Sequence, residues 1–209
     1  MKTKKMICPC CDKEIKLPYR GDVTLHYSSL INEEYGFYDL VDICPECGYT
    51  MLFDNGISDE MKEYVKSDEY RNILLNPKVE EGLKKWMLIA MLSEYDENYT
   101  EAGIEYMKAY DYLEYKDMPL DKRLIEKAAS CFLSAVEEYT SFVDAILAVD
   151  CMRRAGEMKQ AARFLNITKE TFTGELVDKL VFHEDAWILL NQTQKRILYY
   201  LNEIDDLDF

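Results

Sequence analysis

Two pairs of cysteines constrain this chain more than any other feature. Cys8 and Cys11 are separated by two residues, and Cys44 and Cys47 have the same spacing. Two residues between thiols form a tight turn, here called a knuckle, that directs both sulfur atoms to one point. Two knuckles together supply the four thiolates of a tetrahedral site, the arrangement that structural zinc prefers. The sequence therefore predicts that Cys8, Cys11, Cys44 and Cys47 bind one metal ion.

The surroundings of the cysteines favour a metal site. Pro45 stiffens the second knuckle, and Gly48 can take the positive φ that is often needed just after one. The 32 residues between the knuckles exceed the commonest spacing but leave room for short strands. The N-terminal segment up to residue 57, which contains both knuckles, is too small to bury much core by itself, so a bound ion would stabilise it. We expect folding and metal binding to be coupled there.

Zinc and iron are the two candidate ions. The segment Cys44-Pro45-Glu46-Cys47-Gly48, with a second pair of the same spacing, also resembles the iron site of rubredoxins, and a tetrahedron of sulfurs suits either metal. Iron would imply electron transfer. Four thiolate ligands leave no open position for a water molecule, which disfavours catalysis by the metal. Unpaired buried thiols and a pair of disulfides are the other interpretations, and a cytoplasmic setting argues against the disulfides.

The other cysteines and the two histidines receive ordinary roles. Cys10 lies inside the first knuckle, as a passive loop residue, a spare ligand or a redox-sensitive thiol. Cys131 falls on the apolar face of an expected helix, and Cys151 is expected in the core as well. His26 could replace one ligand in principle, but four cysteines are better placed. His183 is expected near a helix start with a surface or core role.

Charge and motifs exclude several classes of function. The 209 residues include 40 acidic and 25 basic side chains, for a net charge of −15, and the basic residues form no concentrated patch. Binding to a nucleic-acid backbone or an anionic membrane depends on such a patch, so neither is an expected partner. No apolar run suits a signal peptide or a membrane span, which predicts a cytoplasmic protein. No phosphate-binding loop, dinucleotide-binding motif or nucleophile elbow is present, so we expect no enzyme.

Beyond residue 57 the hydrophobic period becomes helical. A helix is expected to start at Asn76-Pro77, with Asn76 as N-cap, and the last helix is marked by apolar residues from Trp187 to Leu201. Between them the pattern predicts helices over 99–113, from Pro119 to 139, over 141–155 and over 158–170. The predicted fold class is α+β, mostly α. A small zinc-ribbon-like β module (1–57) precedes a tetratricopeptide-like antiparallel helical bundle (58–209).

Small and large residues alternate within the expected helices. Alanines at 102, 128 and 161 each stand near a large apolar residue, with irregular spacings of 26 and 33 between them. Small residues let two helices approach closely, as in a tetratricopeptide hairpin. Ordinary bundle packing explains the pattern almost as well. Four tyrosines between Tyr106 and Tyr115 either line a peptide-binding groove or belong to the core.

The combination resembles a known bacterial family. Ile7-Cys8-Pro9-Cys10-Cys11, the segment from Tyr38 to Tyr49 and the segment from Asp150 to Met158 resemble the domain-of-unknown-function family 2225. The resemblance implies metal ligands at the four knuckle cysteines, tetratricopeptide-like helices, a bacterial cytoplasmic protein and no established activity. Two features depart from it. Cys10 is an extra thiol, and the helical half is shorter and less regular.

These observations lead to one hypothesis with two alternatives. We expect a non-enzymatic adaptor in which a structural zinc site fixes the N-terminal geometry. Acidic helices bearing tyrosines would present a surface to a basic or mixed-charge protein. A rubredoxin-like iron-binding electron carrier is the first alternative, and a nucleic-acid-binding zinc ribbon, which the net charge disfavours, is the second. The sequence leaves the partner and the oligomeric state open.

Overall fold

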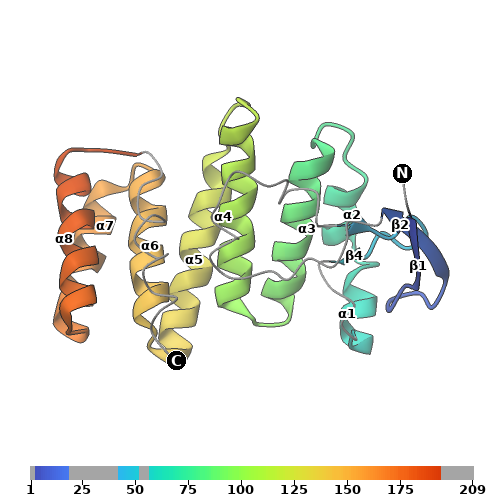
Figure 1. The fold of residues 1–209 in the computed structure, drawn as a ribbon, viewed down its shortest axis with the longest axis horizontal. Coiled ribbons are helices and arrows are strands. Elements are labelled where there is room, and N and C mark those ends of the chain that lie inside the picture. The colour runs from blue at the N-terminus through green and yellow to red at the C-terminus, as the bar shows by residue number, and fades with distance from the viewer. Residues whose placement is uncertain (1–2, 19–41, 52–56, 194–209) are drawn as a thin grey trace. The chain divides into compact units, whose positions relative to one another are not determined.

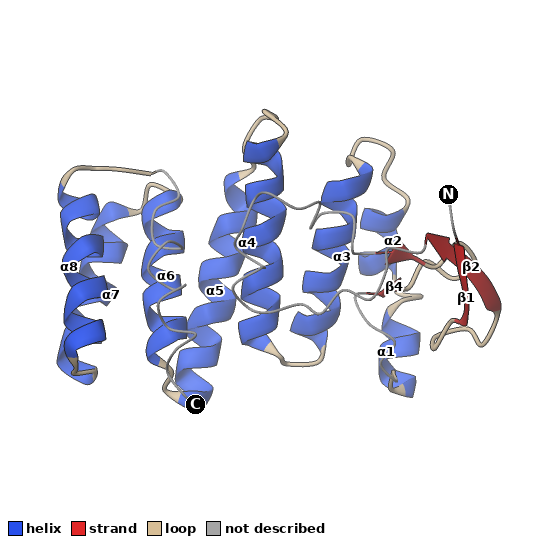
Figure 2. Cartoon of the chain, in the orientation of Figure 1, coloured by secondary structure: helices blue, strands red, loops and turns tan. Residues whose placement is uncertain are grey.

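The computed structural model describes residues 3–18, 42–51 and 57–193, and the chain forms two compact units, Met1–Glu97 and Asn98–Phe209. Most described residues are helical, and short strands occur only near the N-terminus of the described chain (Figure 2). The fold is therefore α+β and mostly α. The predicted module boundary near residue 57 adjoins residues 52–56, which lie outside the described residues, and it stays a prediction.

Two small hairpins lie within the described residues of the first unit. Strand β1 (Thr3–Ile7) pairs antiparallel with β2 (Glu14–Pro18), and β3 (Asp42–Ile43) pairs antiparallel with β4 (Thr50–Met51). The first hairpin carries the Cys8–Cys11 knuckle in its turn, and the second carries the Cys44–Cys47 knuckle. The alternation of polar and apolar residues over 13–17 predicted β2 correctly. The β-prone residues 23–27 and 37–41 lie outside the described residues.

The helices described in the first unit are α1 (Asp59–Tyr64), α2 (Asp68–Leu74) and α3 (Glu81–Tyr95). Ser58 and Ser67 cap α1 and α2, and the side chain of each accepts a hydrogen bond from the backbone N–H of the residue three positions later. An Asp-Glu pair follows each serine, in the first helical turn, where the helix dipole favours negative charge.

The predicted helix start at Asn76 is wrong. Its backbone N–H donates to the carbonyl of Ile73, which closes the end of α2, and its side chain accepts the N–H of Lys78 in the following turn. Glu80 caps α3 instead, because its carboxylate accepts two N–H groups of the first helical turn.

The described part of the second unit, up to residue 193, is a row of antiparallel helices (Figure 1). These are α4 (Tyr99–Tyr115), α5 (Lys122–Tyr139), α6 (Phe142–Arg154), α7 (Met158–Thr171) and α8 (Glu175–Leu189). Each packs mainly against its neighbours in the sequence. Positive φ values of 51° at Asp117 and 78° at Gly156 end α4 and α6, and there the chain reverses. The four central helical predictions are confirmed within a few residues.

Small side chains in the second unit allow close helix contacts. Ala102, Ala128 and Ala161 are fully buried. A Cβ atom on Gly103 would lie 2.8 Å from the ring of Phe132 on α5, so α4 and α5 depend on the missing side chain there. Three of the four clustered tyrosines are buried, and Tyr115 is exposed. The close packing is confirmed, and the tetratricopeptide-like assignment stays a prediction.

The last predicted helix agrees with the described residues only at its start. The described helix α8 begins at Glu175 and ends at Leu189, two residues into the predicted stretch from Trp187 to Leu201. Asn191 takes a φ of 53°, and the N–H of Gln192 donates to the carbonyl of Trp187, which terminates the helix. Leu201 lies outside the described residues. Propensity alone did not reveal this stop, because Asn is tolerated both in a helix and in the left-handed conformation that ends one.

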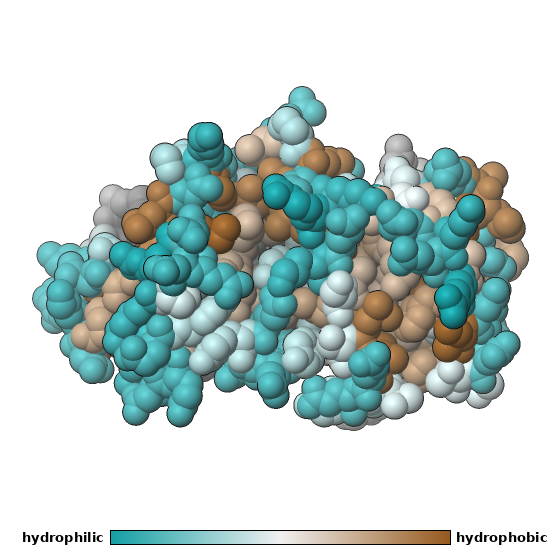
Figure 3. Space-filling view, turned by 180° about the vertical axis from the view of Figure 1, so that it is seen from behind, coloured by the Kyte–Doolittle hydropathy of each residue, from teal (hydrophilic) through white to brown (hydrophobic). Residues whose placement is uncertain are grey.

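The surface is largely polar with separate apolar patches (Figure 3). Among the described residues, Tyr139, Phe182 and Leu189 are large apolar side chains with more than two thirds of their surface exposed. No helix in the described part of the chain combines the length and the apolar character needed to cross a membrane.

Candidate metal centre

The first knuckle is shaped by its backbone. The N–H of Cys8 donates to the carbonyl of Lys13 at 2.9 Å, and the N–H of Asp12 donates back to the carbonyl of Cys8 at 2.9 Å. Asp12 takes a φ of 56°, a left-handed conformation that Asp adopts more readily than most residues. The chain therefore turns sharply, with Cys8 and Cys11 on the inside of the turn.

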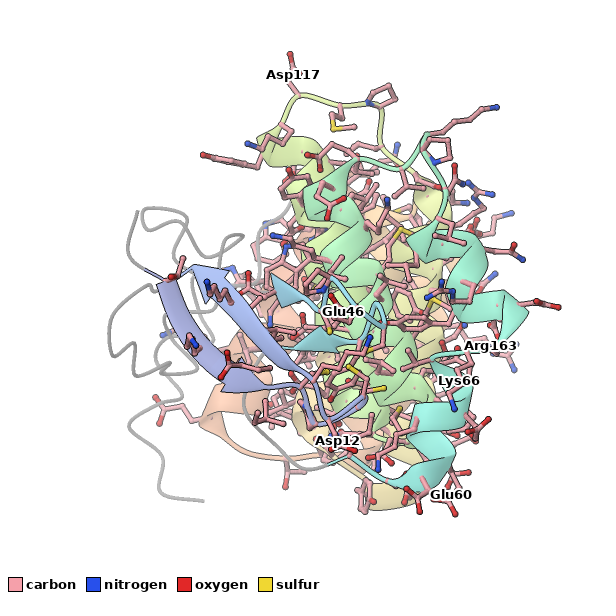
Figure 4. The ribbon with its side chains drawn as sticks, turned by 90° about the vertical axis from the view of Figure 1, so that its right-hand side faces the viewer. Asp12, Glu46, Glu60, Lys66, Asp117 and Arg163 are labelled. Atoms are coloured by element: carbon pink, nitrogen blue, oxygen red, sulfur yellow. The ribbon has the colours of Figure 1, made fainter. Side chains whose placement is uncertain are left out.

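The second knuckle repeats the first. The N–H of Cys44 donates to the carbonyl of Tyr49 at 2.8 Å, and the N–H of Gly48 donates to the carbonyl of Cys44 at 2.9 Å. Gly48 has a φ of 82°, as the sequence predicted. Asp12 is its structural counterpart, and sequence reasoning missed it because Asp, unlike Gly, is not a strong signal for positive φ. Figure 4 labels Asp12 on the first knuckle and Glu46 on the second.

The two knuckles bring all four predicted ligands together. The sulfur atoms of Cys8, Cys11, Cys44 and Cys47 lie within 4.8 Å of one another. The Sγ–Sγ distances are 3.7 Å from Cys8 to Cys47 and 3.9 Å from Cys11 to Cys44. A tetrahedron with metal–sulfur bonds of about 2.3 Å has an edge of about 3.8 Å. The four sulfurs therefore match the size and the donor chemistry of a tetrathiolate metal site.

Disulfide bonding is the alternative that the geometry rejects. All seven cysteines are free thiols in the structure. A disulfide needs sulfurs about 2.0 Å apart, which is far shorter than the two distances between the knuckles.

Burial opposes the ionisation of the thiols. Cys8 and Cys44 are buried, whereas Cys11 and Cys47 are partly exposed. Burial raises the pKa of Cys8 to about 11 and also raises the pKa of Cys47. Burial acts on Cys44 too, but backbone N–H groups of Cys47 and Glu46 donate to its sulfur, and with neighbouring thiols they lower its pKa. A cation placed among the sulfurs would reverse the cost of ionising them.

Apolar side chains pack around the cysteine cluster. Ile15 of β2 is buried next to Cys8 and Cys44, and Met6, Leu17 and Tyr49 pack against the same cluster. An ion pair between Lys13 and Glu46, with a 2.8 Å Nζ–Oε2 distance, links the two knuckles at the surface.

Helix α2 contacts the second knuckle directly. The Tyr70 hydroxyl donates to the carbonyl of Gly48 at 3.0 Å, and the Arg71 guanidinium donates to the carbonyl of Cys47 at 3.1 Å. Sequence reasoning missed both residues because it did not predict α1 and α2. The repeated Ser-Asp-Glu at 58–60 and 67–69 was the available signal, since it places an N-cap and two acidic residues at a helix start.

The remaining cysteines and the described histidine do not belong to the four-sulfur group. Cys10 packs against the cluster without belonging to it, and burial raises the pKa of its thiol. Cys131 and Cys151 are buried in the second unit, as expected of core thiols. His26 lies outside the described residues. His183 lies inside α8 and not near its start, with its ring stacked on that of Trp187.

A second charged cluster is buried in the helical unit. Arg153 contacts Asp150 and donates to Glu184 at 3.0 Å, while Arg154 contacts Asp111. The side chains of these five residues are almost inaccessible to solvent. The hydrophobic pattern could not reveal the cluster, because charged residues at core-facing positions look like defects in a helical repeat.

Comparison of the chain with protein-family models, with curated proteins and with solved structures gave no match. The resemblance to the bacterial domain-of-unknown-function family 2225 therefore stays a prediction.

Proposed function

We propose that this protein binds one structural zinc ion through Cys8, Cys11, Cys44 and Cys47. The observation that carries the proposal is the convergence of four sulfur atoms, from two knuckles of equal geometry, within 4.8 Å. Zinc bound there would hold the two hairpins together and replace the core that so small a β module lacks. Four protein ligands fill the coordination sphere, so the role is structural.

Metal analysis of the purified full chain tests the zinc proposal. We expect about one zinc per chain, and cobalt substitution should give the visible spectrum of a tetrahedral four-thiolate site. The matched pair is Cys11→Ser and Cys10→Ser, because the two residues are neighbours but only Cys11 belongs to the sulfur cluster. Cys11→Ser should lose tight binding, whereas Cys10→Ser should keep it. Equal binding by both variants would contradict the assigned ligand set.

Iron in the same site would show a different signature. A four-thiolate iron protein absorbs strongly in the visible range and bleaches on reduction, whereas the zinc form is colourless. Stoichiometric iron in protein isolated from its native source would replace the zinc proposal with that of an electron carrier.

We further propose that the helical unit serves as a non-enzymatic interaction module for a protein partner. Two features support this role. Helices α4–α8 form a row of antiparallel neighbours, an architecture with long accessible faces. Exposed apolar residues, among them Tyr139 and Phe182, resemble the anchors of protein interfaces.

Site-specific crosslinking tests the interaction role. A photoreactive residue replaces Tyr139 or Phe182, and the matched control replaces the exposed Lys159 of α7. The proposal expects one reproducible crosslinked protein from the first two positions and none from the control. Identical crosslinking patterns at all three positions would indicate unspecific contact and contradict it.

A further inference from the structure

We infer that helix α2 is part of the metal centre, and that Tyr70 and Arg71 are positioning residues for the second knuckle. The inference rests on the proposed function, that the four cysteines bind a metal ion. It adds that affinity for the ion is set partly by a helix that supplies no ligand.

The contacts converge on two consecutive peptide groups. Arg71 donates from Nη1 to the carbonyl of Cys47 at 3.1 Å, and the Tyr70 hydroxyl donates to the next carbonyl, that of Gly48, at 3.0 Å. Since a carbonyl only accepts, the single Tyr70 proton is used there, and the Thr50 hydroxyl, 2.8 Å from the Tyr70 oxygen, is the donor to it. Tyr70 therefore connects the knuckle to strand β4 as well.

These peptide groups control the direction of a ligand. Cys47 is the last ligand of the knuckle, and the planar peptide group that carries its carbonyl fixes its ψ angle. The next peptide group, which carries the Gly48 carbonyl, holds the positive-φ turn that follows the ligand. On the other side, the N–H of Gly48 donates to the carbonyl of Cys44. The knuckle is thus held from within by its own turn and from outside by α2.

Packing reinforces the hydrogen bonds. A Cβ atom on Gly48 would lie 2.2 Å from Cδ2 of Leu74, so the knuckle backbone rests directly on α2. Tyr70 is fully buried, and its ring meets that of Tyr64 of α1 edge to face, with 6.0 Å between ring centroids. The Tyr64 ring stacks on Tyr95 of α3 at 4.2 Å. An unbroken series of contacts therefore joins the sulfur cluster to all three helices of the first unit.

Groups that orient metal ligands from outside the coordination sphere typically change affinity 10- to 100-fold when they are removed. The test measures metal affinity of the full chain by competition with a chromophoric chelator, using Zn²⁺ and Co²⁺. The variants are Tyr70→Phe and Arg71→Gln. The matched controls are Tyr64→Phe, in the same aromatic series, and Arg163→Gln, on the exposed side of α7.

We expect Tyr70→Phe and Arg71→Gln each to weaken binding about 10-fold or more, while both controls stay within about twofold. The Co²⁺ spectrum should keep its four-thiolate form, because no ligand has been changed. A merely structural role would lower the stability of the metal-free and metal-loaded forms equally and leave affinity unchanged. That result, in variants whose helix content matches the unmodified chain, would overturn the inference.

The two proposals fail in different ways. If the unmodified chain binds no metal, the proposed function is wrong. If the unmodified chain binds tightly and the Tyr70→Phe variant binds equally well, only the role of α2 is wrong. Tyr70→Phe removes a single oxygen atom, so it decides the question even if Arg71→Gln does not fold.

Discussion

Gly48 combines two constraints in one residue. Its φ of 82° is a conformation that side chains disfavour, and the position where a Cβ would stand is already occupied by Leu74. Gly156 has a similar φ of 78° but open space around it. Comparing substitutions at Gly48 and Gly156 therefore separates the free-energy cost of a positive φ from the cost of a steric clash.

We predict that Gly48→Ala destabilises the protein by more than Gly156→Ala. Gly156→Ala should cost about 1 kcal/mol, the conformational part alone. Gly48→Ala should cost about 2–4 kcal/mol, because the added methyl group also collides with the Leu74 side chain, which must repack. Urea unfolding of the metal-loaded chain, followed by circular dichroism, gives both values. Equal losses for the two variants would mean that Leu74 moves aside freely.

The buried cluster on α4, α6 and α8 is one source of pH-dependent stability in the second unit. Three carboxylates, of Asp111, Asp150 and Glu184, face two guanidinium groups, of Arg153 and Arg154. One negative charge is therefore in excess. Burial, with the nearby Asp150, raises the pKa of Glu184 to about 8, so that the carboxyl group holds a proton at neutral pH.

A raised carboxyl pKa fixes the sign of the change in folding stability with pH. Between the ordinary value near 4.5 and about 8, the folded state keeps a proton that the unfolded state has lost. Stability therefore falls as pH rises through this window, by at most about 1.4 kcal/mol per pH unit for one group. Above about 8 the contribution levels off, because both states have then lost the proton.

We predict that Glu184→Gln flattens this dependence. The amide mimics the protonated carboxyl group, so the variant should match the unmodified chain near pH 5 and exceed it in stability near pH 9. Unfolding midpoints measured across this range check the prediction, with the exposed Glu138→Gln of α5 as control. A difference between Glu184→Gln and the unmodified chain that does not change with pH would contradict it.

The elements differ in how far the sequence revealed them. The knuckles were predictable, because thiols at fixed spacing have few other uses and local turn geometry brings each pair together. Helices α4 to α7 were predictable from their apolar period. Helices α1 and α2 were missed because they are short and present few apolar residues. Their start signals, Ser58 and Ser67, were the better guide.

Contacts between distant elements had no signal in the sequence. The contact of Arg71 with the Cys47 carbonyl depends on where α2 lies, and a backbone acceptor leaves no trace in the pattern of side chains. The same holds for Arg153 and Glu184, whose pairing requires α6 and α8 to be neighbours in space. The hydrophobic pattern predicts which face of each helix is buried, but not which atoms of other elements that face contacts.

At the scale of the whole molecule, only one of the two units holds the candidate metal site. The first unit, Met1–Glu97, has the sulfur cluster beside buried apolar side chains such as Trp86 and Leu88, whereas the second has an extensive apolar core and no part of that cluster. Removal of a bound ion should therefore affect the two units unequally.

We predict that chelation releases amide protection in the first unit only. Hydrogen exchange of the full chain, with and without a strong chelator, should show faster exchange in the knuckles and in α1 and α2. Protection in α4 to α7 should persist, because burial in the second unit does not involve the metal. A Cys8→Ser variant should exchange rapidly in the first unit even before the chelator is added. Simultaneous loss of protection in both units would show that they fold as one.

The position of the sulfurs along the chain has a thermodynamic consequence. Cys11 and Cys44 stand 33 positions apart, so an ion that joins them also closes a loop of that size. In the chain-entropy treatment of a crosslink, closure of such a loop lowers the conformational entropy of an unfolded chain that keeps the ion bound, which is worth about 4 kcal/mol at 25 °C. The ion would thus act like the disulfide of a secreted protein, but one that opens by ligand exchange and needs no reductant.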